Sequence, residues 1–226
     1  MSQVHGSQVT RVVEDYVTLI WKAFEWPGGA PSTTDLAAQL GVTPSTVSAT
    51  LKKLARDGFI DYEPYGAIEL TDAGRRVAVE IVRRHRILET YLHEKLGMSW
   101  DEVHVEADRL EHAVSDVVLA RMDAGLGHPS SDPHGDPIPD AVGSVVRDQS
   151  VALAESATGT VVRVVRVSDR SPDVLRHLHQ LGVVIGAELC IDGVSAAADA
   201  VAITVAGASV QLSLQTAAAV RVAPAS

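Results

Sequence analysis

Two stretches with helical periodicity, residues 75–96 and 103–122, carry histidine and carboxylate side chains three or four positions apart. Side chains at that spacing share one face of an α-helix. If the two predicted helices face each other, their polar faces form one cluster of imidazole nitrogen and carboxylate oxygen. The residues concerned are His85, Glu89, His104, Asp108, Glu111 and His112.

This donor set is typical of a site for a divalent first-row metal ion. The alternative is a pair of ordinary charged helix faces, because His and Glu one turn apart are common on solvated helices. The spacing alone leaves both interpretations open, and the rest of the chain decides between them.

Residues 33–58 have the pattern of a helix-turn-helix. Thr33 or Thr34 is expected to cap a short helix over 35–40, residues 41–43 form a tight turn, and Pro44 opens a second helix that ends at Gly58. Small hydroxyl side chains at the start of the second helix suit base edges, and the lysines after them suit phosphates. The predicted DNA contacts are Thr33, Thr34, Thr43, Pro44, Ser45, Thr46, Ser48, Ala49, Lys52 and Lys53.

A hairpin is predicted directly after this second helix. Strand-like residues 59–63 and 67–70 flank the turn Pro64-Tyr65-Gly66. A hairpin in this position is typical of the wing of a winged helix. For the two helices before it, the alternative is a plain helical hairpin, and the turn chemistry and the local lysines favour DNA binding.

The C-terminal third changes character. Residues 125–139 are rich in Gly, Pro, Ser and Asp and predict a loop, which carries His128 and His134. Short strand-like runs then follow at 161–167, 188–191, 201–205, 209–214 and 219–222, with a helix over 172–181. Such a series predicts a small β-barrel, and it contains no recognisable catalytic constellation.

Composition limits the possible functions. The net charge is −10, so DNA binding requires a local basic patch rather than a basic molecule. The single cysteine, Cys190, cannot form an internal disulfide and fits a reducing compartment. The sequence shows no long apolar run for a membrane span and no signal-peptide pattern at its start, so we expect a cytoplasmic protein.

Together these motifs resemble the diphtheria-toxin-repressor family over nearly the whole chain. The resemblance is carried by residues 44–48 (Pro-Ser-Thr-Val-Ser), 70–74 (Leu-Thr-Asp-Ala-Gly), 84–89 (Arg-His-Arg-Ile-Leu-Glu), 104–112 and 133–139. It implies a multidomain α+β protein. The expected domains are a winged helix-turn-helix (1–74), a helical dimerisation and metal-binding domain (75–146) and a C-terminal SH3-like barrel (147–226).

The resemblance also implies two metal sites. The primary site falls on Asp108, Glu111, His112 and Asp15 of the first helix. The ancillary site falls on His85, Glu89 and His104. The barrel ligands of longer family members match Ser171 and Val174 here, and the resemblance offers Asp173, which lies between them, as the substitute.

Asp15 and Asp108 distinguish the branches of the family. Iron-responsive members have Met and Cys at these positions, whereas manganese-responsive members have carboxylates, which suit Mn²⁺. The chain therefore resembles the manganese-responsive branch. We expect Mn²⁺ as the cofactor, with two or more ions per subunit, and Fe²⁺ or Co²⁺ as substitutes in solution.

The expected function is a homodimeric, Mn²⁺-activated repressor that binds double-stranded operator DNA and controls metal-uptake genes. We expect no enzymatic activity, no membrane association and no small organic substrate. An Fe²⁺-responsive repressor of the same family is the first alternative. A metal-dependent hydrolase, a manganese-storage protein and a metal-independent winged-helix regulator are the others, and DNA binding titrated with metal separates all three from the repressor.

Overall fold

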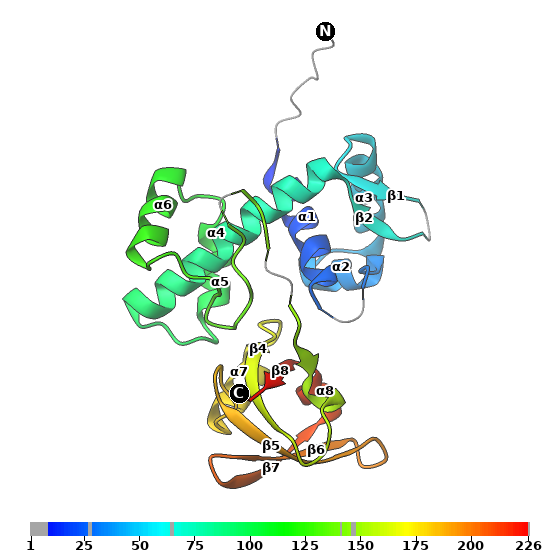
Figure 1. Cartoon of the computed structure of the whole chain (residues 1–226). Helices are drawn as coiled ribbons and strands as arrows, with labels where there is room; N and C mark the ends of the chain where they lie inside the picture. Colours follow the sequence, from blue (N-terminus) through cyan, green and yellow to red (C-terminus); the bar gives the residue numbers. More distant parts are fainter. Residues whose placement is uncertain (1–8, 27–28, 64–65, 141, 146–147, 226) are drawn as a thin grey trace. The chain divides into compact units, whose positions relative to one another are not determined.

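The computed structural model describes residues 9–26, 29–63, 66–140, 142–145 and 148–225. The chain divides into two compact units, Met1–Arg84 with Pro139–Ser144, and His85–Ile138 with Val145–Ser226. The long helix α4 (Asp72–Leu96) belongs to both, because the division falls within it (Figure 1). Each unit is described by itself.

The first unit is a winged helix-turn-helix. Its elements are α1 (Arg11–Phe24), α2 (Thr33–Leu40), α3 (Pro44–Arg56), β1 (Ile60–Tyr62), β2 (Ile68–Leu70) and the start of α4. One apolar side of each helix is buried in a common core, as helical spacing predicts. The largest fully buried side chains there are Ile20, Leu36, Leu51, Leu54 and Ile60.

The helix-turn-helix begins one residue before the predicted cap. Ser32, not Thr33 or Thr34, caps α2: its hydroxyl accepts the Asp35 N–H, and the Asp35 carboxylate accepts the Ser32 N–H. Gly41 ends α2 at φ +65°, where a side chain would be strained. Pro44 is the first residue of α3, as predicted.

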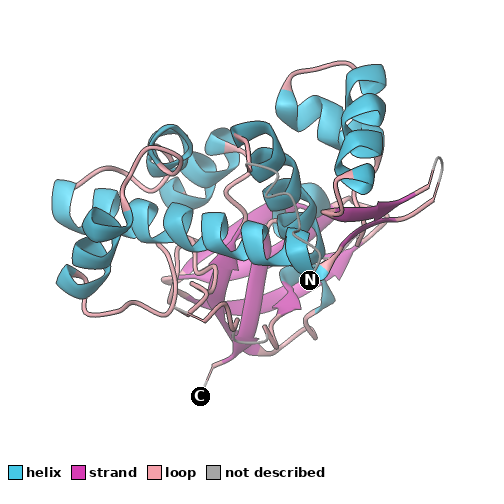
Figure 2. Cartoon of the chain, turned by 90° about the horizontal axis from the view of Figure 1, so that it is seen from above, coloured by secondary structure: helices cyan, strands magenta, loops and turns pink. Residues whose placement is uncertain are grey.

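The wing is the antiparallel pair β1–β2, in which Ile60 faces Leu70 and Tyr62 faces Ile68. Figure 2 shows this hairpin extending away from the helices of its unit. The predicted turn residues Pro64 and Tyr65 lie outside the described residues.

The helical part of the second unit contains the remainder of α4, α5 (Val103–Leu110) and α6 (Asp116–Gly125). The prediction of one helix over 103–122 is wrong, because Ser115 starts a new helix by accepting the Val118 N–H. His112 therefore follows the end of α5. Two apolar clusters hold these helices together, one around Leu88 and Val103 and one around Ile87 and Leu119.

The predicted small barrel is a six-stranded antiparallel sheet in the order β3-β8-β4-β5-β6-β7. Three short elements were not predicted, the two-residue strand β3, the 3-10 helix η1 and the five-residue helix α8. The helix α7 (Pro172–Gln180) closes the apolar core with Leu175 and Leu178. The other bounds are β3 (Val151–Ala152), η1 (Leu153–Glu155), β4 (Val161–Val167), β5 (Glu188–Ser195), β6 (Ala200–Val205), β7 (Ala208–Ser213), α8 (Leu214–Ala218) and β8 (Val220–Pro224).

The start of α4 offers a test of the packing in the first unit. A Cβ on Gly74 would lie 2.0 Å from the Phe59 carbonyl oxygen. Gly74→Ala should therefore push α4 away from the wing and lower the free energy of unfolding by about 2 kcal/mol, a typical cost of overpacking. Gly125→Ala is the control, because no atom lies within 4 Å of the added Cβ. Thermal unfolding of both variants checks this, and equal stabilities would contradict the close contact.

Candidate metal centre

The centre is built on His85 and Glu89, one turn apart on α4, and on His104 of α5. Nε2 of His85 lies 2.9 Å from Oε1 of Glu89 and 3.1 Å from Nδ1 of His104, and that Nδ1 lies 3.1 Å from the same Glu89 oxygen. The side chains of His85 and Glu89 are 1% and 0% exposed. The structure thus brings together the three residues that the resemblance assigns to the ancillary site.

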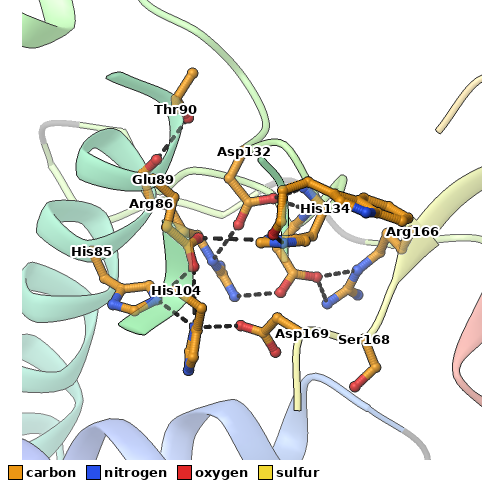
Figure 3. Close-up of polar contacts among 12 residues, drawn as sticks. His85, Arg86, Glu89, Thr90, His104, Asp132, His134, Arg166, Ser168 and Asp169 are labelled. Atoms are coloured by element: carbon orange, nitrogen blue, oxygen red, sulfur yellow. Dashed lines mark hydrogen bonds and ion pairs between the residues drawn. The ribbon is translucent and has the colours of Figure 1, made fainter. Parts of the chain in front are cut away.

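A barrel carboxylate joins this group, but it is not the expected one. Oδ2 of Asp169, two residues after β4, lies 3.0 Å from Nδ1 of His104 (Figure 3). Asp173 instead has an 88% exposed side chain in the first turn of α7 and forms an ion pair with Arg176. Sequence reasoning missed Asp169, although its position just after a predicted strand was a usable signal.

The second group lies on the other side of the His85 ring. Nδ1 of His85 lies 2.7 Å from Oε2 of Glu111 and 3.3 Å from Oδ1 of Asp108. Nε2 of His112 lies 3.2 Å from the other oxygen of Glu111. Asp15, the fourth residue expected in the primary site, lies on α1 of the first unit. Both ring nitrogens of His85 thus face carboxylates.

A third group involves the loop that follows α6. Glu89, Asp132 and His134 are all buried and can each offer one ligand atom within 4.8 Å of the others. Nε2 of His134 donates a 2.6 Å hydrogen bond to the Trp100 carbonyl, which leaves Nδ1 facing Oε2 of Glu89 at 3.8 Å. Neither of these two facing atoms has a hydrogen-bond partner among the described residues.

The sequence predicted only a loop position for His134. The loop owes its fixed shape to Asp132, whose Oδ1 accepts the N–H groups of His134 and Asp136 at 2.8 and 2.9 Å. An aspartate that closes its own turn in this way is a recognisable motif. The burial of the neighbouring imidazole, however, depends on residues distant in the sequence.

The buried groups perturb one another's ionisation. Burial would raise the pKa of Glu89, but the charge of His85 and the neighbouring imidazoles of His104 and His134 hold that pKa well below its usual range. Burial would lower the pKa of His134, but the Glu89 carboxylate that faces it and the charges of Asp132 and Asp169 raise it to about 10. Burial and the charges of Asp136 and Glu89 raise the pKa of Asp132 well above its usual range.

These observations decide between the two interpretations of the sequence pattern. A pair of solvated helix faces would leave His85 and Glu89 in water, yet both are buried. Buried polar atoms normally have hydrogen-bond partners, so the facing Oε2 and Nδ1 atoms fit a site for a cation. The donors are nitrogen and oxygen without sulfur, which fits a first-row divalent ion.

Of the predicted DNA-contacting residues, Thr33 (half-buried) and Thr34 (exposed) open α2, and the others lie on α3 or at its cap. Thr43, Pro44, Ser45, Thr46 and Ala49 are exposed, Ser48 is half-buried, and Lys52 and Lys53 are exposed on the next turns. The Thr43 hydroxyl accepts the Thr46 N–H at 3.2 Å and also contacts the hydroxyls of Ser45 and Thr46. No helix in the described part of the chain is long and apolar enough to cross a membrane.

Three family models match the chain in succession. Residues 8–68 match the N-terminal DNA-binding domain of iron-dependent repressors. Residues 71–140 match the metal-binding and dimerisation domain of the same repressors. Residues 151–224 match the FeoA domain.

Similar proteins extend over most of the chain. The iron-dependent repressor IdeR of Mycobacterium leprae is 32% identical over 192 residues, which cover 79% of this chain and 83% of that protein. The diphtheria toxin repressor of Corynebacterium glutamicum is 32% identical over 219 residues, covering 92% and 94%. A solved manganese-dependent transcriptional repressor in complex with manganese is 42% identical at a TM-score of 0.89, covering 94% and 100%.

The order of domains, the buried nitrogen and oxygen donors and these similarities lead to one conclusion, which confirms the family suggested by the sequence motifs. The relatives are repressors and not enzymes. The chain belongs to the diphtheria toxin repressor family of metal-dependent transcriptional repressors.

Proposed function

We propose that this protein is a homodimeric, Mn²⁺-activated repressor that binds operator DNA of metal-uptake genes in the cytoplasm. The observation that carries the proposal is the sulfur-free second group, in which Asp108 and Glu111 lie together beside His85. The functional domains would be residues 1–74, 75–146 and 147–226.

The primary site would comprise Asp108, Glu111 and His112 from the second unit and Asp15 from the first. Three carboxylates and one imidazole suit Mn²⁺, which accepts oxygen-rich coordination. His85 has an orienting role in this site, because its Nδ1 lies 2.7 Å from Oε2 of Glu111. Partners of this kind fix the direction of a metal-binding carboxylate.

The ancillary site would comprise two groups that share Glu89: His85, Glu89 and His104, and the loop group of Glu89, Asp132 and His134. One oxygen of this carboxylate lies among His85 and His104, and the other faces His134. A second ion bound here, with Asp169 and Asp132 as further oxygen donors, gives the expected two or more ions per subunit. Binding at His134 requires the neutral imidazole, so it releases a proton.

The residues link metal binding to DNA binding through the chain itself. Asp15 lies on α1, which packs in the same core as α2 and α3. Fixing the position of Asp15 would therefore also fix α3, the helix proposed to contact DNA. A bound divalent ion would supply the positive charge that holds the carboxylates of the two units together. A metal that binds the DNA-competent arrangement better shifts the population towards it.

Apolar side chains on α5 and α6 provide a surface for dimerisation. Val105, Leu110, Val117 and Val118 are between 37% and 66% exposed. Apolar side chains exposed in this way suit a symmetric interface between two copies of the chain. Such a dimer would place two α3 helices near one DNA turn apart, or a multiple of it.

The second candidate is an Fe²⁺-responsive repressor, which the names of the mycobacterial relatives favour. Hydrolase and storage functions have no support in the relatives. Operator binding measured against a series of divalent metals separates the two repressor candidates.

The first functional prediction concerns a primary-site ligand. Asp108→Ala should raise the Mn²⁺ concentration needed for half-maximal operator binding by more than about tenfold, because even the loss of an outer-shell partner costs that much. Glu106→Ala is the matched control: Glu106 is also an acid on α5, with a side chain 39% exposed, but it pairs with Arg109. An Asp108→Ala variant with the full Mn²⁺ response would remove the primary-site assignment.

The second functional prediction concerns which metal ion activates the protein. Asp108→Cys combined with Asp15→Met introduces sulfur donors, which favour iron over manganese. The double variant should respond to lower Fe²⁺ and higher Mn²⁺ concentrations than wild type in anaerobic operator-binding titrations. Wild type that responds better to Fe²⁺ would instead establish the iron-responsive candidate.

The third functional prediction concerns DNA binding by α3. Replacing Lys52 and Lys53 by Ala should weaken binding to all DNA sequences alike and reduce the slope of affinity against salt by about one per lost phosphate contact. Lys95→Ala, an exposed charge on α4, is the control for net charge. Unchanged salt slopes in fluorescence anisotropy titrations would show that α3 does not contact phosphates through these lysines.

A further inference from the structure

A series of buried and partly buried ion pairs crosses the second unit from α4 to β8. We call it the charge ladder, and it consists of Arg86, Asp136, Arg166, Asp148 and Arg221. Arg166 donates to Asp136 at 2.6 Å and to Asp148 at 2.7 Å. Arg86 donates to the other oxygen of Asp136 at 3.4 Å, and Arg221 donates to Asp148 at 3.1 Å. Figure 3 shows the first part of this series beside the metal centre.

The ladder is costly to bury. The side chains of Arg86, Asp136 and Arg166 are 1%, 6% and 3% exposed. Removing charges from water costs free energy that their attraction often only offsets, so buried ion pairs are weak evidence for stability. Their better-attested role is to specify one arrangement of the parts that they join. The arrangement specified here joins the helices to the barrel.

Three members of the ladder are each close in sequence to a residue of the ancillary site. Arg86 follows His85 on α4. Asp136 is two residues after His134, and Arg166 is three residues before Asp169. The ladder therefore connects three segments that supply the site from different parts of the chain.

The loop of His134 packs directly on the strand of Arg166. Gly135 has φ +84°, and a Cβ there would lie 1.9 Å from the Val165 carbonyl oxygen. The Val167 N–H donates to the His134 carbonyl at 2.9 Å. The backbones of loop and strand are thus in contact on both sides of Arg166, and its side chain forms the ion pair at that contact.

We propose that Arg166 is the positioning residue of the ancillary site. By pairing with Asp136 and Asp148, it holds the His134 loop and the strand end before Asp169 at the helical residues, before any ion binds. The barrel is then a built-in part of the metal centre and not a domain recruited by metal. The ion-binding part of this inference rests on the proposed function, whereas the docking of loop on strand does not.

The test uses two variants and a matched control in the full-length chain. Arg166→Met removes the central positive charge of the ladder, so the carboxylates of Asp136 and Asp148 both lose this ion-pair partner. Asp136→Asn with Arg166→Gln removes both charges but keeps a polar amide at each position, in case the first variant does not fold. Arg163→Met lies on the same strand, but Arg163 is 45% exposed and pairs only at the surface with Glu188.

Two measurements separate positioning from general stability. Mn²⁺ binding, followed through the electron paramagnetic resonance of the free ion, should show two classes of site in wild type and in the Arg163 control. The Arg166 variants should weaken the ancillary class by about tenfold or more, as loss of an outer-shell partner does, and leave the Asp108 class unchanged. Hydrogen exchange in the metal-free protein should show lost protection at Val167 in the Arg166 variants only.

The outcomes are distinct. The inference would be overturned if the Arg166 variants fold, bind Mn²⁺ at both classes of site with wild-type affinity and keep Val167 protected from exchange. Equal weakening of both classes would also overturn it, because that result indicates general destabilisation. Wild type that binds no Mn²⁺ would remove the proposed function, and the metal-free exchange result would still decide whether Arg166 docks the loop.

Discussion

The buried carboxylate of Glu89 is the constraint on which the second unit depends. It is fully buried among three imidazoles, one from its own helix, one from α5 and one from the loop after α6. An isolated carboxylate at this depth would be protonated or would prevent folding. The histidines instead keep its pKa low, and each histidine comes from an element that must pack correctly for the charge to be compensated.

This requirement explains why the metal centre and the fold are hard to separate. His104 and His134 reach Glu89 only because α5 and the Asp132 turn hold them there. The same packing leaves Oε2 of Glu89 and Nδ1 of His134 facing each other without a hydrogen bond. A site that compensates its buried charge with titratable imidazoles can exchange protons for a divalent cation without rebuilding its surroundings.

The sequence allowed prediction of the parts of the fold that depend on local periodicity. The helix-turn-helix, the wing, α4 and most barrel strands follow from apolar spacing and from turn residues such as Gly41 and Pro44. Asp108, Glu111 and His85 could be grouped because they are one turn apart or lie on adjacent helices. The break between α5 and α6 was missed, because a single cap at Ser115 outweighs a continuous apolar pattern.

Asp169 and His134 could not be assigned in the same way, for a physical reason. Their places at the centre depend on the contact between a loop and a strand about 30 residues away, and no periodicity records such a contact. Asp173 was the expected barrel ligand, but its side chain is 88% exposed, whereas the carboxylate of Asp169, four residues earlier, lies 3.0 Å from His104. The Arg166–Asp136 pair, with 30 residues between its members, is the kind of contact that makes this difference.

Metal selectivity cannot follow from the donor atoms alone. Nitrogen and oxygen donors bind Zn²⁺ more tightly than Mn²⁺ at a given site, so the strongest binder need not be the activating ion. The difference must arise in the arrangement that the bound ion stabilises. A site with many oxygen donors spread over rigid segments favours an ion that accepts high coordination without a preferred geometry. A four-coordinate ion would bind only some of these donors. The carboxylates that it does not bind would then repel each other. If the donors are held rigidly in place before metal binds, the ion whose coordination number matches them stabilises the active arrangement. Coordination number, rather than affinity, would then decide which ion activates the repressor.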